Sequence, residues 1–149
     1  MDEIRVGIIG FGFMGRAHIY GYKTIPLYYA NLPFKIRLVG ICDTVPGVAE
    51  KAKEQLGFEF ATTNPDDIFN CPDIDVIDIC TPNIYHKDGI ERALKGGKHV
   101  YCDKPLAASY EEGKEVVELC KQYNKVTQMA LQYRFYPGTM RIKELIDEG

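Results

Sequence analysis

The stretch that decides the fold is IRVGIIGFGFMGRAH, residues 4–18. Its first seven residues are almost all apolar or glycine, which is typical of a strand buried on both faces. Three glycines follow at the spacing G-x-G-x-x-G, at positions 10, 12 and 15, and a helical pattern begins near Phe13. This order of strand, glycine turn and helix predicts a tight connection whose backbone lies open at the end of the strand.

Each glycine of this loop has a separate physical role. Gly10 allows the tight turn, Gly12 leaves the backbone N–H groups accessible to a pyrophosphate, and Gly15 lets the helix pack closely on the strand. The N-terminus of the helix then faces the phosphates with its partial positive charge. The loop therefore predicts a dinucleotide site. The contacts expected from it are Gly10, Phe11, Gly12, Phe13, Met14 and Gly15.

Apolar runs alternate with helical patterns over the rest of the chain. Further strands are expected at residues 36–43, 58–61, 76–80, 99–102 and 125–132. Helices are expected at 46–56, in a short stretch after Asn64, at 86–95, after Ser109 and at 137–149. Apolar strands that alternate with helices indicate a parallel sheet covered on both faces. The sequence predicts an α/β fold, a Rossmann doubly wound six-stranded sheet of order 3-2-1-4-5-6, with residues 1–149 as one domain.

Local signals predict how two of these helices begin and end. Thr44 is expected to cap the helix at 46–56 and Gly57 to end it. Ser109 and Glu112 have the spacing of a capping box for the later helix. The apolar face of that helix is expected to consist of Val116, Val117, Leu119 and Cys120.

Asp43 closes the second expected strand. A carboxylate there can accept hydrogen bonds from both hydroxyls of an adenosine ribose, and it would repel a 2′-phosphate. No Lys or Arg follows before Lys51. These features predict a preference for NAD over NADP, and a plain helix cap is the alternative role for Asp43.

Two features receive no functional assignment from the sequence. Residues 20–35 form an aromatic-rich stretch, interpreted as an enlarged connection that serves packing or a protein contact. Asp78 interrupts the apolar run at 76–80, and the pattern does not explain it.

Composition excludes several classes of protein. Lys and Arg total 18 against 21 Asp and Glu, so the chain lacks the basic surface that nucleic acids or anionic membranes require. No apolar run approaches the roughly 20 residues of a membrane span. The five cysteines form no C-x-x-C pair, which indicates reduced thiols and no metal site. The acidic start of the chain does not have the pattern of a signal peptide, so a cytoplasmic location is expected.

Four motifs in order identify a family resemblance. They are GFGFMGRAH at 10–18, ICTPNIYH at 79–86, HVYCDKPLA at 99–107 and LQYRFYP at 131–137. Together they resemble the N-terminal, NAD-binding domain of the glucose–fructose oxidoreductase, inositol dehydrogenase and MocA family of sugar and cyclitol oxidoreductases. The resemblance covers essentially the whole chain.

The resemblance implies further site residues. Lys104 matches the lysine of the family's E-K-P motif, which orients the reacting hydroxyl, and is the expected catalytic residue. Asp103 stands where the family usually has glutamate, and Gln132 where many members have asparagine. The implied cofactor contacts are Thr81, Pro82, Asn83, His86, Asp103, Lys104 and Gln132.

The resemblance also implies that catalysis requires a second domain. Family members carry a second, C-terminal domain that supplies the substrate pocket and a proton-accepting histidine, whereas this chain ends at RIKELIDEG. We therefore expect it to bind NAD without turnover, as part of an enzyme that oxidises a secondary alcohol of a sugar or cyclitol. The alternatives are a non-catalytic NAD-binding regulatory module, a site for CoA or another nucleotide, and a subunit or homo-oligomer that associates through Tyr133, Phe135 and Tyr136.

Overall fold

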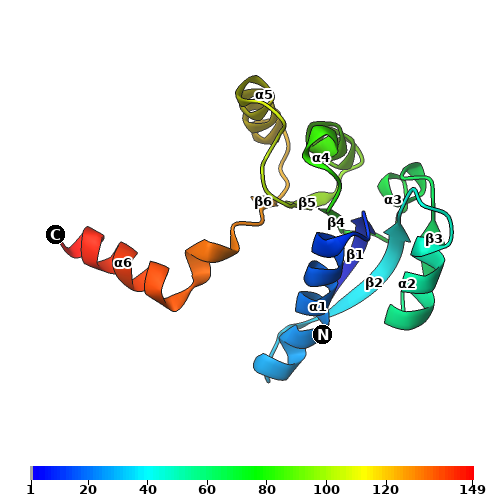
Figure 1. Cartoon of the computed structure of the whole chain (residues 1–149), viewed down its shortest axis with the longest axis horizontal. Coiled ribbons are helices and arrows are strands. Elements are labelled where there is room, and N and C mark those ends of the chain that lie inside the picture. Colours follow the sequence, from blue (N-terminus) through cyan, green and yellow to red (C-terminus); the bar gives the residue numbers. More distant parts are fainter. Residues whose placement is uncertain (1) are drawn as a thin grey trace.

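A computed structural model describes residues 2–149 and contains one six-stranded parallel sheet (Figure 1). The strands are β1 (Asp2–Ile9), β2 (Phe34–Cys42), β3 (Phe60–Thr62), β4 (Val76–Ile79), β5 (His99–Cys102) and β6 (Thr127–Met129). Their order is β3-β2-β1-β4-β5-β6, which confirms the predicted Rossmann topology. β6 is shorter than predicted because it pairs only with the last three residues of β5, after which the chain leaves the sheet.

Helices cover both faces of the sheet. They are α1 (Phe13–Tyr28), α2 (Val48–Leu56), α3 (Asp66–Phe69), α4 (His86–Lys95), α5 (Tyr110–Lys121) and α6 (Pro137–Glu148), with short 3-10 helices η1 (Asn83–Tyr85) and η2 (Gln132–Phe135). One core cluster joins α1 and α2 to β1 and β2, and includes Ile8, Ile19, Ile41 and Ala52. The other joins α3, α4 and α5 to β1, β2, β4 and β5, and includes Ile9, Ile68, Ile77, Ile90 and Val116.

The aromatic-rich stretch at 20–35 differs from the prediction. It is not an enlarged connection, because α1 continues to Tyr28 and only residues 29–33 link it to β2. Pro26 lies in the last turn of α1, where a proline removes one hydrogen bond without ending the earlier turns. Tyr22 points inward from this helix, whereas Tyr20 and Tyr28 are exposed.

The predicted helix ends are partly confirmed. Gly57 ends α2 in the left-handed conformation, with φ of 78°. Thr44 was the wrong cap, because the chain first turns through Gly47, at φ 77°, and α2 begins only after it. The Ser109 hydroxyl accepts a hydrogen bond from the Glu112 N–H at 3.2 Å, as predicted for α5.

The apolar face of α5 is narrower than predicted. Val116 is buried, and Leu119 and Cys120 pack against the same core. Val117 was wrongly included, because it lies on the exposed side of the helix.

The chain leaves the sheet after β6, and α6 extends away from the body (Figure 1). None of the residues of η2 and α6 is buried. The exposed aliphatic and aromatic side chains of this segment are Tyr133, Phe135, Tyr136, Met140, Ile142, Leu145 and Ile146. The segment therefore presents an apolar surface that the sheet does not cover.

Two glycines of α1 allow the close packing of this helix to be tested. A Cβ on Gly15 would lie 2.1 Å from the carbonyl oxygen of Gly10, whereas a Cβ on Gly21 would meet nothing within 4 Å. We expect Gly15→Ala to lower the free energy of unfolding by roughly 1–3 kcal/mol. Gly21→Ala should raise it by up to about 1 kcal/mol, because alanine is the better helix former.

Urea unfolding of both variants measures the difference. Equal effects of the two substitutions would show that close approach of helix and strand does not constrain position 15.

Candidate functional site

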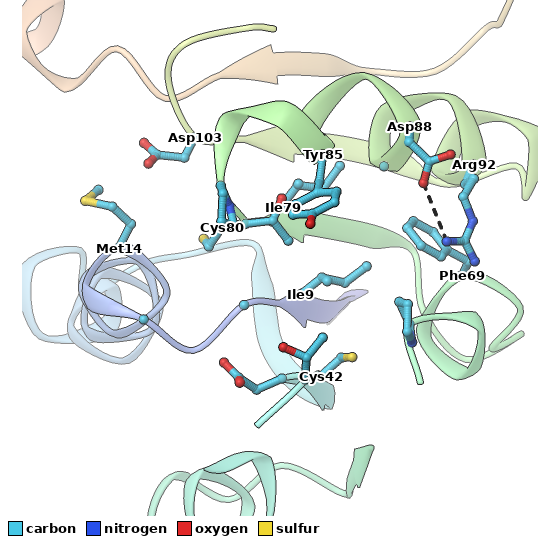
Figure 2. A pocket seen from close by; sticks show the side chains of 18 of the residues that line it. Ile9, Met14, Cys42, Phe69, Ile79, Cys80, Tyr85, Asp88, Arg92 and Asp103 are labelled. Atoms are coloured by element: carbon cyan, nitrogen blue, oxygen red, sulfur yellow. Dashed lines mark ion pairs between the residues drawn. The ribbon is translucent and has the colours of Figure 1, made fainter. Parts of the chain in front are cut away.

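A cleft opens where the glycine loop and the carboxyl ends of β2 and β4 meet (Figure 2). It has a volume of about 720 Å³, within the range of small-molecule sites in proteins. Its lining residues are Ile9, Gly10, Gly12, Phe13, Met14, Cys42, Asp43, Thr44, Pro65, Phe69, Ile79, Cys80, Thr81, Pro82, Tyr85, Asp88, Gly89, Arg92 and Asp103. The cleft lies at the switch point between β1 and β4, where open α/β sheets bind ligands.

The glycine loop forms one wall of the cleft. Gly10 has φ of 99°, a conformation that favours glycine, and a Cβ there would lie 2.6 Å from the Cys80 carbonyl oxygen. Gly12 precedes the first residue of α1 and receives no side-chain cap. Nothing lies within 4 Å of the place where its Cβ would be, so the open N-terminus of α1 faces the cleft. Such a helix end binds phosphate groups.

Asp43 is fixed at the edge of the cleft by two backbone amides. The N–H of Phe11 donates to Oδ2 and the N–H of Val45 donates to Oδ1, both at 2.9 Å. The carboxylate therefore joins the glycine loop to the end of β2. Each carboxylate oxygen has a second lone pair, so both can still accept a hydrogen bond from a ligand hydroxyl. Because the bond to Val45 lies before α2 begins, Asp43 does not cap that helix.

Two polar groups at the other end of the cleft lack a partner. The Thr81 hydroxyl oxygen and Oδ1 of Asp103 are buried, and neither has a hydrogen bond among residues 2–149. Leaving such a group unsatisfied costs about 1–3 kcal/mol. A bound ligand that donates hydroxyl or amide hydrogens would satisfy both, so this end of the cleft fits a polar ligand.

The charge of the cleft comes from carboxylates. Asp43, Asp88 and Asp103 line it, and Arg92 is the only cation among the described lining residues. Arg92 forms an ion pair with Asp66 and lies 3.6 Å from Oδ2 of Asp88. An added phosphate on the ligand would therefore find no unpaired cation here.

Only some of the other site residues predicted from the sequence line the cleft. Phe13, Met14, Thr81, Pro82 and Asp103 line the cleft. Phe11 is buried beneath the loop and contributes its N–H to Asp43. The structure places five others outside the lining. These are Gly15 and His86, which are buried, and Asn83, Lys104 and Gln132, which are exposed.

His86 connects the two loops that follow β4 and β5. Its Nε2 lies 2.9 Å from the carbonyl oxygen of Thr81, and its Nδ1 lies 2.6 Å from that of Pro105. The ring donates to one carbonyl in either neutral tautomer and to both when it is protonated. His86 thus positions Thr81 on one side and the Asp103–Lys104 segment on the other.

A buried polar cluster explains Asp78, which the sequence left without a role. The Asp78 carboxylate is 0% exposed and accepts hydrogen bonds at 3.0 Å from His18 Nδ1 and from the Tyr22 hydroxyl. Cys80 contributes a longer contact from its thiol, at 3.4 Å. His18 and Tyr22 are four residues apart on one face of α1, a spacing that indicates a shared partner.

The same cluster brings together three side chains of the types that bind metal ions. The ligand atoms of His18, Asp78 and Cys80 lie within 4.8 Å of one another. Hydrogen bonds among these side chains account for the short distances without an ion. The Tyr22 hydroxyl adds a further hydrogen bond to the Asp78 carboxylate.

Protonation in the cluster follows from burial and from the charge of Asp78. Burial lowers the pKa of His18, but the hydrogen bond and charge of Asp78, with the charge of Asp103, outweigh it and raise the pKa above 6.5. Burial and Asp78 both raise the pKa of Tyr22 and of Cys80. These two groups therefore remain protonated and act as donors.

The fold and the cleft together define a dinucleotide-binding Rossmann domain. The family described as "Oxidoreductase family, NAD-binding Rossmann fold", the glucose–fructose oxidoreductase, inositol dehydrogenase and MocA family, matches residues 4–131. The chain belongs to this family, which confirms the resemblance seen in the sequence. Among residues 2–149, no helix combines the length and apolar character needed to cross a membrane.

Two relatives have named activities. Levoglucosan dehydrogenase of Pseudarthrobacter phenanthrenivorans is 39% identical over 150 residues, covering 100% of this chain and 38% of the enzyme. Inositol 2-dehydrogenase/D-chiro-inositol 3-dehydrogenase of Lactiplantibacillus plantarum is 34% identical, covering 97% of this chain and 40% of the enzyme.

A solved structure of levoglucosan dehydrogenase in complex with NADH and levoglucosan matches 99% of this chain and 40% of that one. The TM-score is 0.93 at 37% identity. The chain thus spans about 40% of the length of these relatives.

The raised pKa of His18 makes the stability of the fold depend on pH. The protonated ring is favoured in the folded chain, so its contribution is complete below pH 6.5 and is lost as the pH rises through the higher folded value. We expect His18→Gln to lower the free energy of unfolding more at pH about 6 than at pH about 9. Urea unfolding at a series of pH values measures this cost.

Tyr22→Phe is the matched control. It removes a hydrogen bond to the same carboxylate without removing a group that titrates in this range, so its cost should stay nearly constant. A cost of His18→Gln that also stays constant would contradict a protonated His18 in the folded chain.

Proposed function

We propose that the chain binds NAD(H) across the cleft and prefers it to NADP(H). The observation that carries this proposal is the Asp43 carboxylate, fixed by the N–H groups of Phe11 and Val45 at the end of β2. In this position it accepts hydrogen bonds from the adenosine ribose hydroxyls, and its charge opposes a 2′-phosphate. The absence of an unpaired cation among the described lining residues supports the same preference.

The rest of the cofactor is assigned along the cleft. The pyrophosphate lies at the loop from Gly10 to Met14, against the N-terminus of α1. The nicotinamide ribose lies toward Thr81 and Asp103, whose buried oxygen atoms it would satisfy. The exposed residues Asn83 and Gln132 are proposed as further contacts, and His86 as the residue that holds the two loops in place.

Lys104 is the proposed catalytic residue. It is exposed, directly after the buried Asp103, beside the end of the cleft assigned to the nicotinamide. An ammonium group there would orient the hydroxyl of a substrate and stabilise negative charge that develops on its oxygen. The bound cofactor supplies the acceptor for the hydride.

The reaction proposed for the larger enzyme is the oxidation of a secondary alcohol on a sugar or cyclitol. The relatives named as levoglucosan and inositol dehydrogenases support this class of substrate. The five cysteines are free in the structure, which suits a reducing compartment, and we assign the chain to the cytoplasm.

A second candidate is a module that binds NAD(H) and associates with another protein or another copy of the chain. The observation that favours it is the apolar surface of η2 and α6, on which Tyr133, Phe135 and Tyr136 are exposed. Exposed apolar surface of this extent is typical of a protein contact.

Ligand-dependent thermal unfolding tests the preference for NAD(H). A ligand present at about 100 times its dissociation constant adds about 2.7 kcal/mol to the free energy of unfolding. We expect NADH to raise the melting temperature more than NADPH at equal concentration. Asp43→Asn should reduce the effect of NADH and narrow the difference between the two dinucleotides, because it removes the charge and one acceptor oxygen.

Asp73→Asn is the control, since Asp73 is an exposed partner of Arg5 outside the cleft. It should leave the ligand shifts unchanged. A larger shift with NADPH than with NADH would contradict the role given to Asp43, and no shift with either would contradict the dinucleotide site itself.

The chain alone should not catalyse dehydrogenation. Its three histidines are engaged elsewhere, because His18 donates to Asp78, His86 contacts two carbonyl groups and His99 accepts from the Val126 N–H. None of them lines the cleft as a base for a substrate hydroxyl. We expect no NADH fluorescence to develop when the chain is incubated with NAD and levoglucosan or inositol. Measurable NADH formation would overturn this expectation.

A further inference from the structure

The cleft has a second polar wall, opposite the end that contains Asp103. It is built by Phe69 of α3, by Tyr85 of η1, and by Asp88 and Arg92 of α4 (Figure 2). Tyr85 directly precedes α4, and Asp88 and Arg92 follow it at helical spacing. The glycine loop and Asp43 do not contribute to this wall. The roles proposed for them therefore do not explain why these side chains line the cleft.

The geometry of the cleft determines which part of a dinucleotide reaches this wall. This step rests on the proposed function. Asp43 marks the adenosine ribose, and the glycine loop marks the pyrophosphate. Figure 2 shows Met14 and Asp103 at one end of the cleft and Phe69 and Arg92 at the other. A dinucleotide with its nicotinamide near Asp103 therefore directs its purine base toward Phe69, Asp88 and Arg92.

The Arg92 side chain is held in a defined position. Its guanidinium carbon lies 4.1 Å from the centre of the Phe69 ring, a cation–π arrangement. It also forms an ion pair with Asp66, and its Nη1 lies 3.6 Å from Oδ2 of Asp88. Arg92 is thus fixed by three neighbours from two helices. A flat, fixed guanidinium of this kind can border a purine ring and donate to its nitrogen atoms.

Close packing of α4 brings these side chains to the cleft. A Cβ on Gly89 would lie 3.1 Å from Cδ1 of Ile79, so the helix approaches β4 closely at this turn. Gly89 itself lines the cleft between Asp88 and Arg92 in the chain. Its missing side chain permits this close approach, which holds Asp88 and Arg92 beside the cleft.

The two charged groups offer opposite hydrogen-bonding character side by side. The carboxylate of Asp88 only accepts, and the guanidinium of Arg92 only donates. The edge of adenine has a matching pattern, an N6 amino group that donates beside a ring nitrogen that accepts. Hypoxanthine has an oxygen in place of the amino group, which would face the lone pairs of Asp88. We propose that Asp88 and Arg92 read the purine and select adenine over a 6-oxopurine.

Binding of two dinucleotides that differ only in the purine, at position 6 and in the proton on N1, tests the proposal. The ligands are NADH and reduced nicotinamide hypoxanthine dinucleotide, and their nicotinamide fluorescence reports binding to the 149-residue chain. We expect NADH to bind about 10-fold more tightly, the lower part of the range for a paired contact to a base. In Asp88→Asn the amide can donate to the oxygen of hypoxanthine, so the preference should fall toward equality.

Glu91→Gln is the matched control on the same helix. Glu91 pairs with Lys95 and lies outside the cleft, so its variant should keep the full preference for NADH. Equal binding of both dinucleotides by the parent chain, or an unchanged preference in Asp88→Asn, would overturn the inference while leaving the dinucleotide site in place. Failure of the parent chain to bind either dinucleotide would overturn the proposed function as well.

Discussion

The site depends first on the two hydrogen bonds that the Asp43 carboxylate accepts from Phe11 and Val45. These bonds tie the glycine loop to the end of β2, and therefore fix the position of the loop relative to Asp43 at the edge of the cleft. The glycines make this possible, because a Cβ at Gly10 or Gly15 would collide with backbone atoms. A charged side chain that organises its own loop before any ligand arrives reduces the ordering cost of binding.

The opposite side of the cleft is organised by buried groups that do not touch it. His86 contacts backbone carbonyls in the loops after β4 and β5, and Asp78 binds α1 to β4 through His18 and Tyr22. Met14 lies one helical turn before His18, so the helix that borders the cleft is anchored directly below it. Buried polar groups that are fully paired in this way favour one arrangement of the elements around them.

The sequence predicted the elements and the glycine loop well, because periodicity and turn residues report local burial. The helix at residues 86–95 and the sheet order agree with the structure. Errors arose where a local signal was ambiguous, as in the stretch 20–35, where α1 continues past the predicted connection, and at Thr44 before Gly47. The partners of Asp78 could not be predicted in the same way. His18 lies 60 residues away, and only the crossing from β1 to β4 brings the two together.

The placement of α6 divides the chain into two parts with different stability. A helix of 12 residues with no buried side chain is marginal in water, since packing supplies most of the stability of protein helices. The sheet is secured as far as Ala130, whose N–H donates to the Cys102 carbonyl oxygen. Beyond it, local opening of the backbone requires little free energy. The cooperative folding unit of this chain therefore ends near residue 130, and a protease would trim the remainder before it reached the dinucleotide cleft.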